Sequence, residues 1–126
     1  MNRARRPPLQ HPLAPLFDRA VGSLGAALNP ETVRHYRGTV RHFLTYLGVQ
    51  HPEVRCLDQL RRDPHLLGWL THLRSQTPPL ATASCIPLLV HLPSVLAELA
   101  WAEQKPALAQ LLRHEDVPRM PQRLPR

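Results

Sequence analysis

Apolar residues recur at three- and four-residue steps between Asn29 and Gly48, and this pattern predicts an amphipathic helix. Asn29 can cap the free N–H groups of the first turn, and Pro30 follows at the first helical position, where a missing N–H costs nothing. Gly48 is expected to end the helix, because glycine adopts the left-handed conformation without strain. The apolar positions that share one face are Val33, Tyr36, Val40, Phe43, Leu44 and Leu47.

A first helix is predicted before this segment, from about Leu13 to Leu28. Gly22 and Gly25 lie inside it, and each costs about 1 kcal/mol relative to alanine. These glycines either allow another helix to approach closely or end the helix early, near Gly25. The connection that follows the Asn29–Gly48 segment is polar, apart from a short apolar turn at Leu57–Leu60.

Two further helices are predicted from signals in the second half of the chain. Asp63 and Pro64 repeat the sequence of a cap followed by proline, so a helix is expected to run from there to about Ser75. A last short helix is expected over Ala107–His114, with its leucines turned inward. The residues that the Asp63–Ser75 helix should bury are Leu66, Leu67, Trp69, Leu70 and Leu73.

A long segment with helical periodicity runs from Thr82 to Glu103. Thr82 or Ser84 is expected to cap it. Pro93 lies well inside it, where a proline removes one hydrogen bond and clashes with the preceding turn at a cost of about 3 kcal/mol. We therefore expect a kink, or two shorter helices that meet near His91.

The two ends of the chain lack this periodicity. Residues 1–11 are rich in arginine and proline and are typical of a flexible basic arm, whereas residues 115–126 form a Pro/Arg-rich linker that cannot build a core. At 126 residues the chain is about one domain long. Since no strand or internal repeat is indicated, residues 12–114 are expected to form an all-α bundle of four to five helices.

The composition adds a strong positive charge to this helical picture. Sixteen lysine and arginine residues face nine acidic ones, which gives a formal net charge of +7 and a pI near 11.0. This balance favours a polyanionic partner, nucleic acid before an acidic membrane. No segment is apolar enough to cross a bilayer, and the N-terminus has no signal-peptide core, so a cytoplasmic protein without a membrane partner is expected.

The basic residues of the Asn29–Gly48 segment lie opposite its apolar face. Arg34, Arg37 and Arg41 form one stripe about two turns long, and no acidic residue follows Glu31 to pair with them along the helix. A solvated face is the simplest explanation of such a run. However, arginine has the planar fork that suits phosphate oxygens and guanine edges, so we predict contact with DNA. The flanking residues that could add hydrogen bonds are His35, His42 and Thr45.

Eight histidines and two cysteines raise the question of a metal or catalytic site. A zinc-binding helix spaces its histidines four residues apart, whereas two pairs here are seven apart and are expected to be solvated or DNA-facing. Cys56 and Cys85 show no CxxC motif and are expected to be reduced, partly buried thiols. We therefore expect no metal, no cofactor, no small-molecule substrate and no catalytic residue. The two histidine pairs are His35 with His42 and His65 with His72.

The order of these features resembles the N-terminal core-binding domain of tyrosine recombinases and phage integrases, a SAM-like helical domain. The resemblance covers roughly Leu13 to Arg126. The Leu57–Leu60 turn and the helix around Trp69 follow in the expected order, and the ending VPRMPQRLPR looks like the linker to a catalytic domain. The best-matched motif positions are Thr32, Tyr36, Val40, Phe43, Leu44, Tyr46 and Leu47.

This resemblance implies a DNA-binding domain that grips one side of a duplex, while a separate catalytic domain with a tyrosine nucleophile cuts it. Such a domain would begin after Arg126, so the chain is expected to bind double-stranded DNA without cleaving it. Tyr36 and Tyr46 match the family's core pattern instead. The family's later long helix usually adds basic contacts, but residues 82–103 contain no arginine or lysine, and Thr82 and Ser84 are the expected phosphate donors there.

Two other classes of function stay open. A helical protein-interaction module, including a remnant that docks onto recombinase subunits, would need an exposed apolar patch in place of a basic one. A compact helix-turn-helix regulator is weakened, because the Gly48–Asp63 connection is far longer than the turn of about 3–4 residues in that motif.

Overall fold

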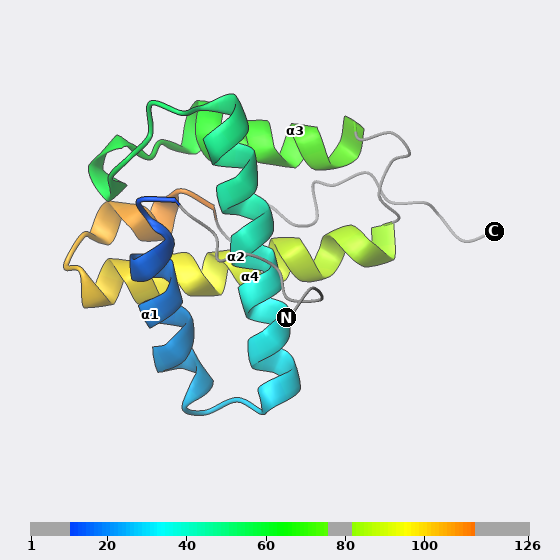
Figure 1. Cartoon of the computed structure of the whole chain (residues 1–126), viewed down its shortest axis with the longest axis vertical. Helices are drawn as coiled ribbons and strands as arrows, with labels where there is room; N and C mark the ends of the chain where they lie inside the picture. Colours follow the sequence, from blue (N-terminus) through cyan, green and yellow to red (C-terminus); the bar gives the residue numbers. More distant parts are fainter. Residues whose placement is uncertain (1–10, 76–81, 113–126) are drawn as a thin grey trace, which may run out of the picture.

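A computed structural model of the chain describes the backbone of residues 11–75 and 82–112, and the side chains of residues 11–73 and 91–112 (Figure 1). No strand occurs in these ranges, so the prediction of an all-α fold is confirmed. The expected arm and linker lie outside the described residues, except for His11. The elements are α1 (Ala14–Gly25), α2 (Pro30–Gln50), α3 (Leu67–Ser75) and α4 (Thr82–Ala102), with short turns η1 (Leu57–Gln59), η2 (Arg62–Leu66) and η3 (Pro106–Gln110).

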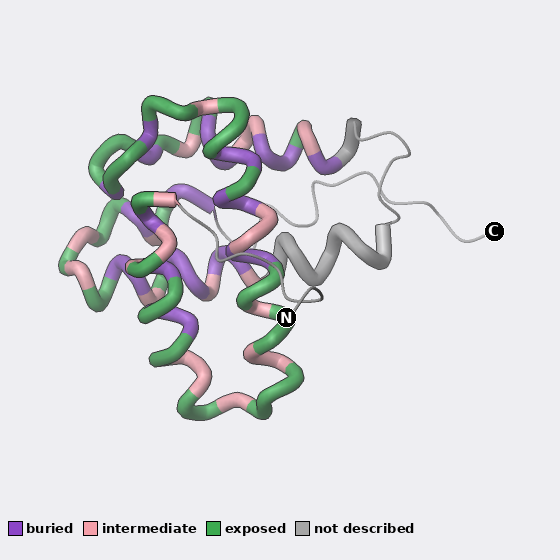
Figure 2. The backbone as a smooth tube through the Cα atoms, viewed as in Figure 1, coloured by how far each residue is buried: buried purple, intermediate pink, exposed green. Residues whose placement is uncertain are grey.

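The helices pack around the middle of α2. α1 and α2 form an antiparallel pair joined by a short loop, and α4 crosses both of them (Figure 1). α3 lies across the C-terminal end of α2, and η3 folds back onto α4. Buried backbone concentrates where these helices meet, whereas the loop between α1 and α2 is largely exposed (Figure 2).

α2 begins as the sequence predicts and ends two residues later. The side chain of Asn29 accepts a hydrogen bond from the Thr32 N–H over 2.8 Å, with Pro30 next in the chain. Gly48 does not end the helix, because its φ is not positive and the His51 N–H continues the ladder to the carbonyl of Leu47. On the apolar face Val33 and Tyr36 are half-buried, and the fully buried residues are Val40, Phe43, Leu44 and Leu47.

Three aromatic rings form the centre of the core. Phe17 of α1, Phe43 of α2 and Trp69 of α3 are each 0% exposed. The centroid of the Phe43 ring lies 6.3 Å from that of Phe17 and 5.3 Å from that of Trp69, the latter edge to face. This row of rings ties α1, α2 and α3 together.

Glycine explains the close approach of α1 and α2. α1 ends at Gly25, so the earlier of the two expected ends is confirmed. A Cβ atom at Gly25 would lie 3.0 Å from Cγ2 of Val33, so glycine lets the first turn of α2 pack against the end of α1. A Cβ atom at Gly22, by contrast, would meet nothing within 4 Å.

α4 is continuous from Thr82 to Ala102, so the expectation of two shorter helices that meet near His91 is wrong, while a kink stays a prediction. Both candidate caps, Thr82 and Ser84, lie within the bounds of the helix, and their side chains lie outside the described residues. Pro93 is buried, and one face of the uninterrupted helix presents four buried neighbours. Burying each of these contributes about 1.5–3 kcal/mol, which together outweighs the cost of a helical proline, about 3 kcal/mol. The four neighbours are Leu92, Val95, Leu96 and Leu99.

The other elements match the predictions in part. The turn at Leu57–Leu60 buries both of its leucines, and of the residues expected to be buried in α3 only Leu67 is half-exposed. The expected helix at Ala107–His114 is instead the 3-10 turn η3. Before it, Gln104 adopts a left-handed conformation (φ 56°), which turns the chain back so that η3 packs against α4.

We predict that two glycine-to-alanine substitutions act in opposite directions. A Cβ atom at Gly68 would lie 2.6 Å from the Tyr46 hydroxyl, so Gly68→Ala should lower the free energy of unfolding by about 1–3 kcal/mol. Gly22→Ala should raise the free energy of unfolding by about 0.4–1 kcal/mol, because alanine lowers the conformational entropy of the unfolded chain. Urea denaturation measures both, and Tyr46→Phe should relieve most of the Gly68→Ala penalty. Equal effects of the two alanines would contradict the Gly68–Tyr46 contact.

Candidate nucleic-acid interface

The predicted DNA-binding residues of α2 all lie outside the core. Arg34, His35, Arg37 and Thr45 are exposed, and the two remaining residues are half-buried. The side chains of Thr82 and Ser84, at the start of α4, lie outside the described residues. The half-buried pair, Arg41 and His42, therefore marks the place where this face meets the rest of the domain.

The N-terminal half of the face carries acidic partners that the sequence did not suggest. Glu31 pairs with Arg34 over 2.9 Å and with His35 over 3.3 Å, and Asp18 of α1 pairs with Arg37. No acidic residue follows Glu31 on α2, as noted from the sequence, yet two of the three arginines still have acidic partners, because Glu31 pairs forward with Arg34 and Asp18 comes from α1. Exposed pairs of this kind contribute little, about 0–1 kcal/mol, so phosphate groups can compete for both arginines.

The C-terminal half of the face forms a pocket of about 600 Å³ between α2 and α3. It is lined by seven residues of α2, among them Gly38, Arg41, His42 and Thr45, and by His72 of α3. Three of the predicted binding residues are therefore brought together here. None of the described residues that line the pocket carries a carboxylate, and Arg41, His42 and Thr45 supply hydrogen-bond donors to it.

The ring of His42 is held from behind by the core. The indole N–H of Trp69 donates a hydrogen bond to Nδ1 of His42 over 3.1 Å. Nδ1 is therefore unprotonated, and in the neutral ring the proton sits on Nε2, which becomes a donor. Burial, and secondarily the charge of His72, lowers the pKa of His42. His42 thus has its ring orientation set by the core and, when neutral, donates from Nε2. It is half-buried and not freely solvated, and the alternative that it faces DNA stays a prediction.

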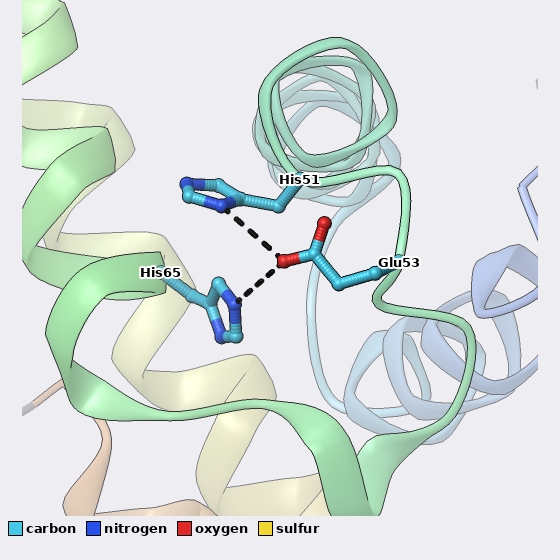
Figure 3. Close-up of side chains that lie close together, drawn as sticks. All are labelled: His51, Glu53 and His65. Atoms are coloured by element: carbon cyan, nitrogen blue, oxygen red, sulfur yellow. Dashed lines mark ion pairs between the residues drawn. The ribbon is translucent and has the colours of Figure 1, made fainter.

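A second group of polar side chains lies at the end of α2 (Figure 3). His51 follows the last residue of α2, and its Nδ1 lies 3.7 Å from the carboxylate of Glu53. Nε2 of His65, in η2, lies 4.0 Å from the same carboxylate oxygen. The other ring nitrogen of His51 lies 3.4 Å from the Tyr46 hydroxyl. The group links the loop after α2 to the start of α3.

The residue types of this group are those of a metal site, but the protonated ring nitrogen of His65 is not the one that a metal ligand would have protonated. The ligand atoms of His51, Glu53 and His65 lie within 4.8 Å of one another. A metal-bound histidine coordinates with one nitrogen and donates an N–H from the other. In His65 the arrangement is reversed, because Nδ1 accepts the backbone N–H of Arg61 over 2.9 Å and so leaves the proton on Nε2. The geometry fits a carboxylate that lies close to two histidine rings, at 3.7 and 4.0 Å, which are longer than hydrogen-bond distances.

Sequence reasoning missed this group and placed His65 wrongly. His65 is buried and not solvated, since its ring fills space between η2 and the loop after α2. The available signal was the short run His51-Pro52-Glu53, but the third member lies twelve residues further on and in another element. For Cys56 the expectation of a free thiol is confirmed, but that of partial burial is wrong, because this thiol is exposed.

No family model, curated protein or solved structure matches this chain. Among the helices that the structure describes, none has the length and apolar character needed to span a membrane.

We predict that acid destabilises the fold. His11, His42 and His65 each accept an N–H at Nδ1, and protonation removes that acceptor. Burial is the main cause that lowers the pKa of each below 6.5 in the folded state, so the unfolded chain takes up protons first. The stability they contribute is fully present above about pH 6.5 and is lost as the pH falls below it.

Urea midpoints measured between pH 7.5 and 4.5 check this prediction. His65→Asn keeps an oxygen acceptor for the Arg61 N–H but cannot titrate, so it should show a weaker pH dependence than the parent. A parent stability that stays constant or rises below pH 6.5 would contradict the neutral state of these histidines.

Proposed function

We propose that this chain is a DNA-binding module, of the SAM-like type found in the core-binding domains of tyrosine recombinases, which grips duplex DNA with the outer face of α2. One observation carries the proposal. The packing of α1, α3 and α4 buries one side of α2 and leaves its arginine side accessible, with a pocket in its C-terminal half whose described lining residues carry no carboxylate. Together with the net charge of +7, this favours a polyanion as the partner.

The dimensions of α2 support this choice. A helix of 21 residues is about 30 Å long, and the major groove of B-DNA, about 12 Å wide, admits such a helix. Arg34 and Arg41 lie two turns apart on the exposed side, where they can reach phosphates on the groove walls or base edges on its floor. Arg37 lies nearer α1 and must exchange Asp18 for a phosphate.

We also propose that the chain binds DNA without cutting it. A tyrosine nucleophile has to be accessible and activated. Tyr46 is buried, and its burial raises the pKa of the hydroxyl. Tyr36 is half-buried, with its ring stacked 4.4 Å from that of His91 on α4. Both tyrosines therefore contribute to packing between elements.

A separate observation favours a second candidate function, the docking of another protein. Trp101 is 80% exposed at the end of α4, beside a hollow of about 740 Å³ between α4 and η3. Exposed tryptophan is typical of interface hot spots. This surface is on a different part of the molecule from the arginine face, so Trp101→Gln should impair docking onto other subunits and leave DNA binding unchanged.

We predict that replacing Arg34, Arg37 and Arg41 by alanine weakens binding to every duplex sequence. Each phosphate contact adds about 0.9 to the slope of log affinity against log salt, so the triple variant should flatten this slope by roughly 2–3 units. If one arginine reads a guanine, its loss should cost about 1–3 kcal/mol on a preferred site and much less elsewhere. Fluorescence anisotropy over a range of salt concentrations measures both effects.

The matched control removes the same charge elsewhere. It replaces three cationic residues by alanine. Two of these three have acidic partners, just as two of the three α2 arginines, Arg34 and Arg37, do. This control should change affinity far less than the triple α2 variant. A folded α2 variant with the parent's affinity and salt slope would favour the docking candidate instead. The control residues are Arg19, Arg55 and Lys105.

We further predict no covalent attachment to DNA. Incubation with a nicked duplex, followed by denaturing electrophoresis, should leave the chain unmodified. An adduct that mass spectrometry maps to Tyr36 or Tyr46 would contradict the assignment of both tyrosines to packing.

A further inference from the structure

The position of Gly38 is not explained by packing. Gly38 lies in the middle of α2, where glycine destabilises a helix by about 1 kcal/mol relative to alanine. A Cβ atom there would meet nothing within 4 Å, whereas one at Gly25 or Gly68 would meet a neighbour at 3.0 Å or less. Gly22 is equally open but lies on α1, outside the pocket. Gly38 differs from it in lining the pocket.

Three donors lie next to Gly38 on the same face of α2. Arg41, His42 and Thr45 follow it at steps of three, four and seven residues, so the four positions form one continuous patch. They offer a guanidinium, an Nε2–H and a hydroxyl, and all line the pocket. Because no carboxylate lines its described part, the pocket suits a ligand with several anionic oxygens.

His42 is suited to donate to such a ligand at neutral pH. The Trp69 indole fixes its tautomer and its ring orientation, and the Trp69 ring is itself packed on Phe43. The Nε2–H therefore does not have to be ordered when a ligand arrives, which reduces the entropy lost on binding. A phosphate group bears the oxygens that guanidinium, imidazole N–H and hydroxyl donors recognise.

We propose that the pocket between α2 and α3 seats one phosphate group. Arg41 supplies charge, His42 and Thr45 donate hydrogen bonds, and Gly38 leaves room for the chain that carries the phosphate to approach the helix. We call this site the phosphate seat, or simply the seat. The phosphate that it binds belongs either to the backbone of duplex DNA or to a free nucleotide. Binding of the DNA backbone rests on the proposed function, whereas the seat itself is tested with small phosphates.

The decisive variant separates the two roles of His42. The side-chain oxygen of asparagine can stand in for Nδ1, so His42→Asn keeps an acceptor for Trp69 but removes the Nε2–H. The variant should fold like the parent and bind inorganic phosphate and a nucleoside monophosphate about tenfold more weakly at pH 7.5. Thr45→Val, at an exposed position, removes a second donor and should have a smaller effect in the same direction. Calorimetric titration measures both, with Arg19→Gln as a control that should bind like the parent.

Gly38→Ala tests the approach of the phosphate-bearing chain. It should raise the thermal midpoint of the protein as Gly22→Ala does. It should nevertheless weaken the binding of duplex DNA several-fold, with little effect on the binding of inorganic phosphate. Gly22→Ala should leave DNA affinity unchanged. A gain in stability with a loss of binding is the result that a merely structural glycine does not give.

The outcomes separate the seat from the proposed function. If the small phosphates bind in a way that depends on His42 but duplex DNA does not bind, the seat stands for nucleotides and the proposed function fails. If DNA binding depends on the arginines of α2 while small phosphates do not bind, or bind independently of His42 and Thr45, the proposed function stands and the seat is overturned. Unchanged phosphate affinity in folded His42→Asn and Thr45→Val also overturns it.

Discussion

The edge-to-face contact between Phe43 and Trp69 is the constraint on which the rest of the structure depends. Phe43 also meets Phe17, so one residue of α2 joins the helices on both of its sides. A fully buried indole N–H needs a partner, because an unsatisfied buried donor costs about 1–3 kcal/mol. His42, the chain neighbour of Phe43, provides that partner. Packing of the core thus fixes the orientation of a side chain that lines the surface pocket.

The same requirement keeps several histidines neutral. In the described part of the chain, His11, His42 and His65 each use Nδ1 to accept an N–H, and burial lowers the pKa of all three. For His65 this protonation state argues against a metal at the group that it forms with His51 and Glu53. For His42 it leaves a donor on the outer side of the ring. Hydrogen bonds that satisfy the interior therefore determine the chemistry available at the surface.

The distribution of charge matters more to the binding face than its total. A net charge of +7 suggests a uniformly basic molecule, yet Asp18 and Glu31 neutralise the N-terminal half of the exposed side of α2. The pocket in the C-terminal half has no acidic lining residue in the described part of the chain. A phosphate meets less repulsion from the described residues there, which favours the C-terminal half of α2 as the centre of the proposed DNA-binding face.

The sequence by itself determined the elements whose cause is local. The Asn29 cap and the apolar face of α2 depend on residues within a few positions, and a periodic pattern records them. The pattern leaves the end of α1 open between Gly25 and Leu28, and the structure has it at Gly25. Tertiary structure alone decided that α4 runs through Pro93, that Asp18 pairs with Arg37, and that Trp69 orients His42. In each case the partner comes from another helix or from the burial of a whole face. A linear pattern specifies which side of a helix is buried, but not which side chains of a distant helix meet it.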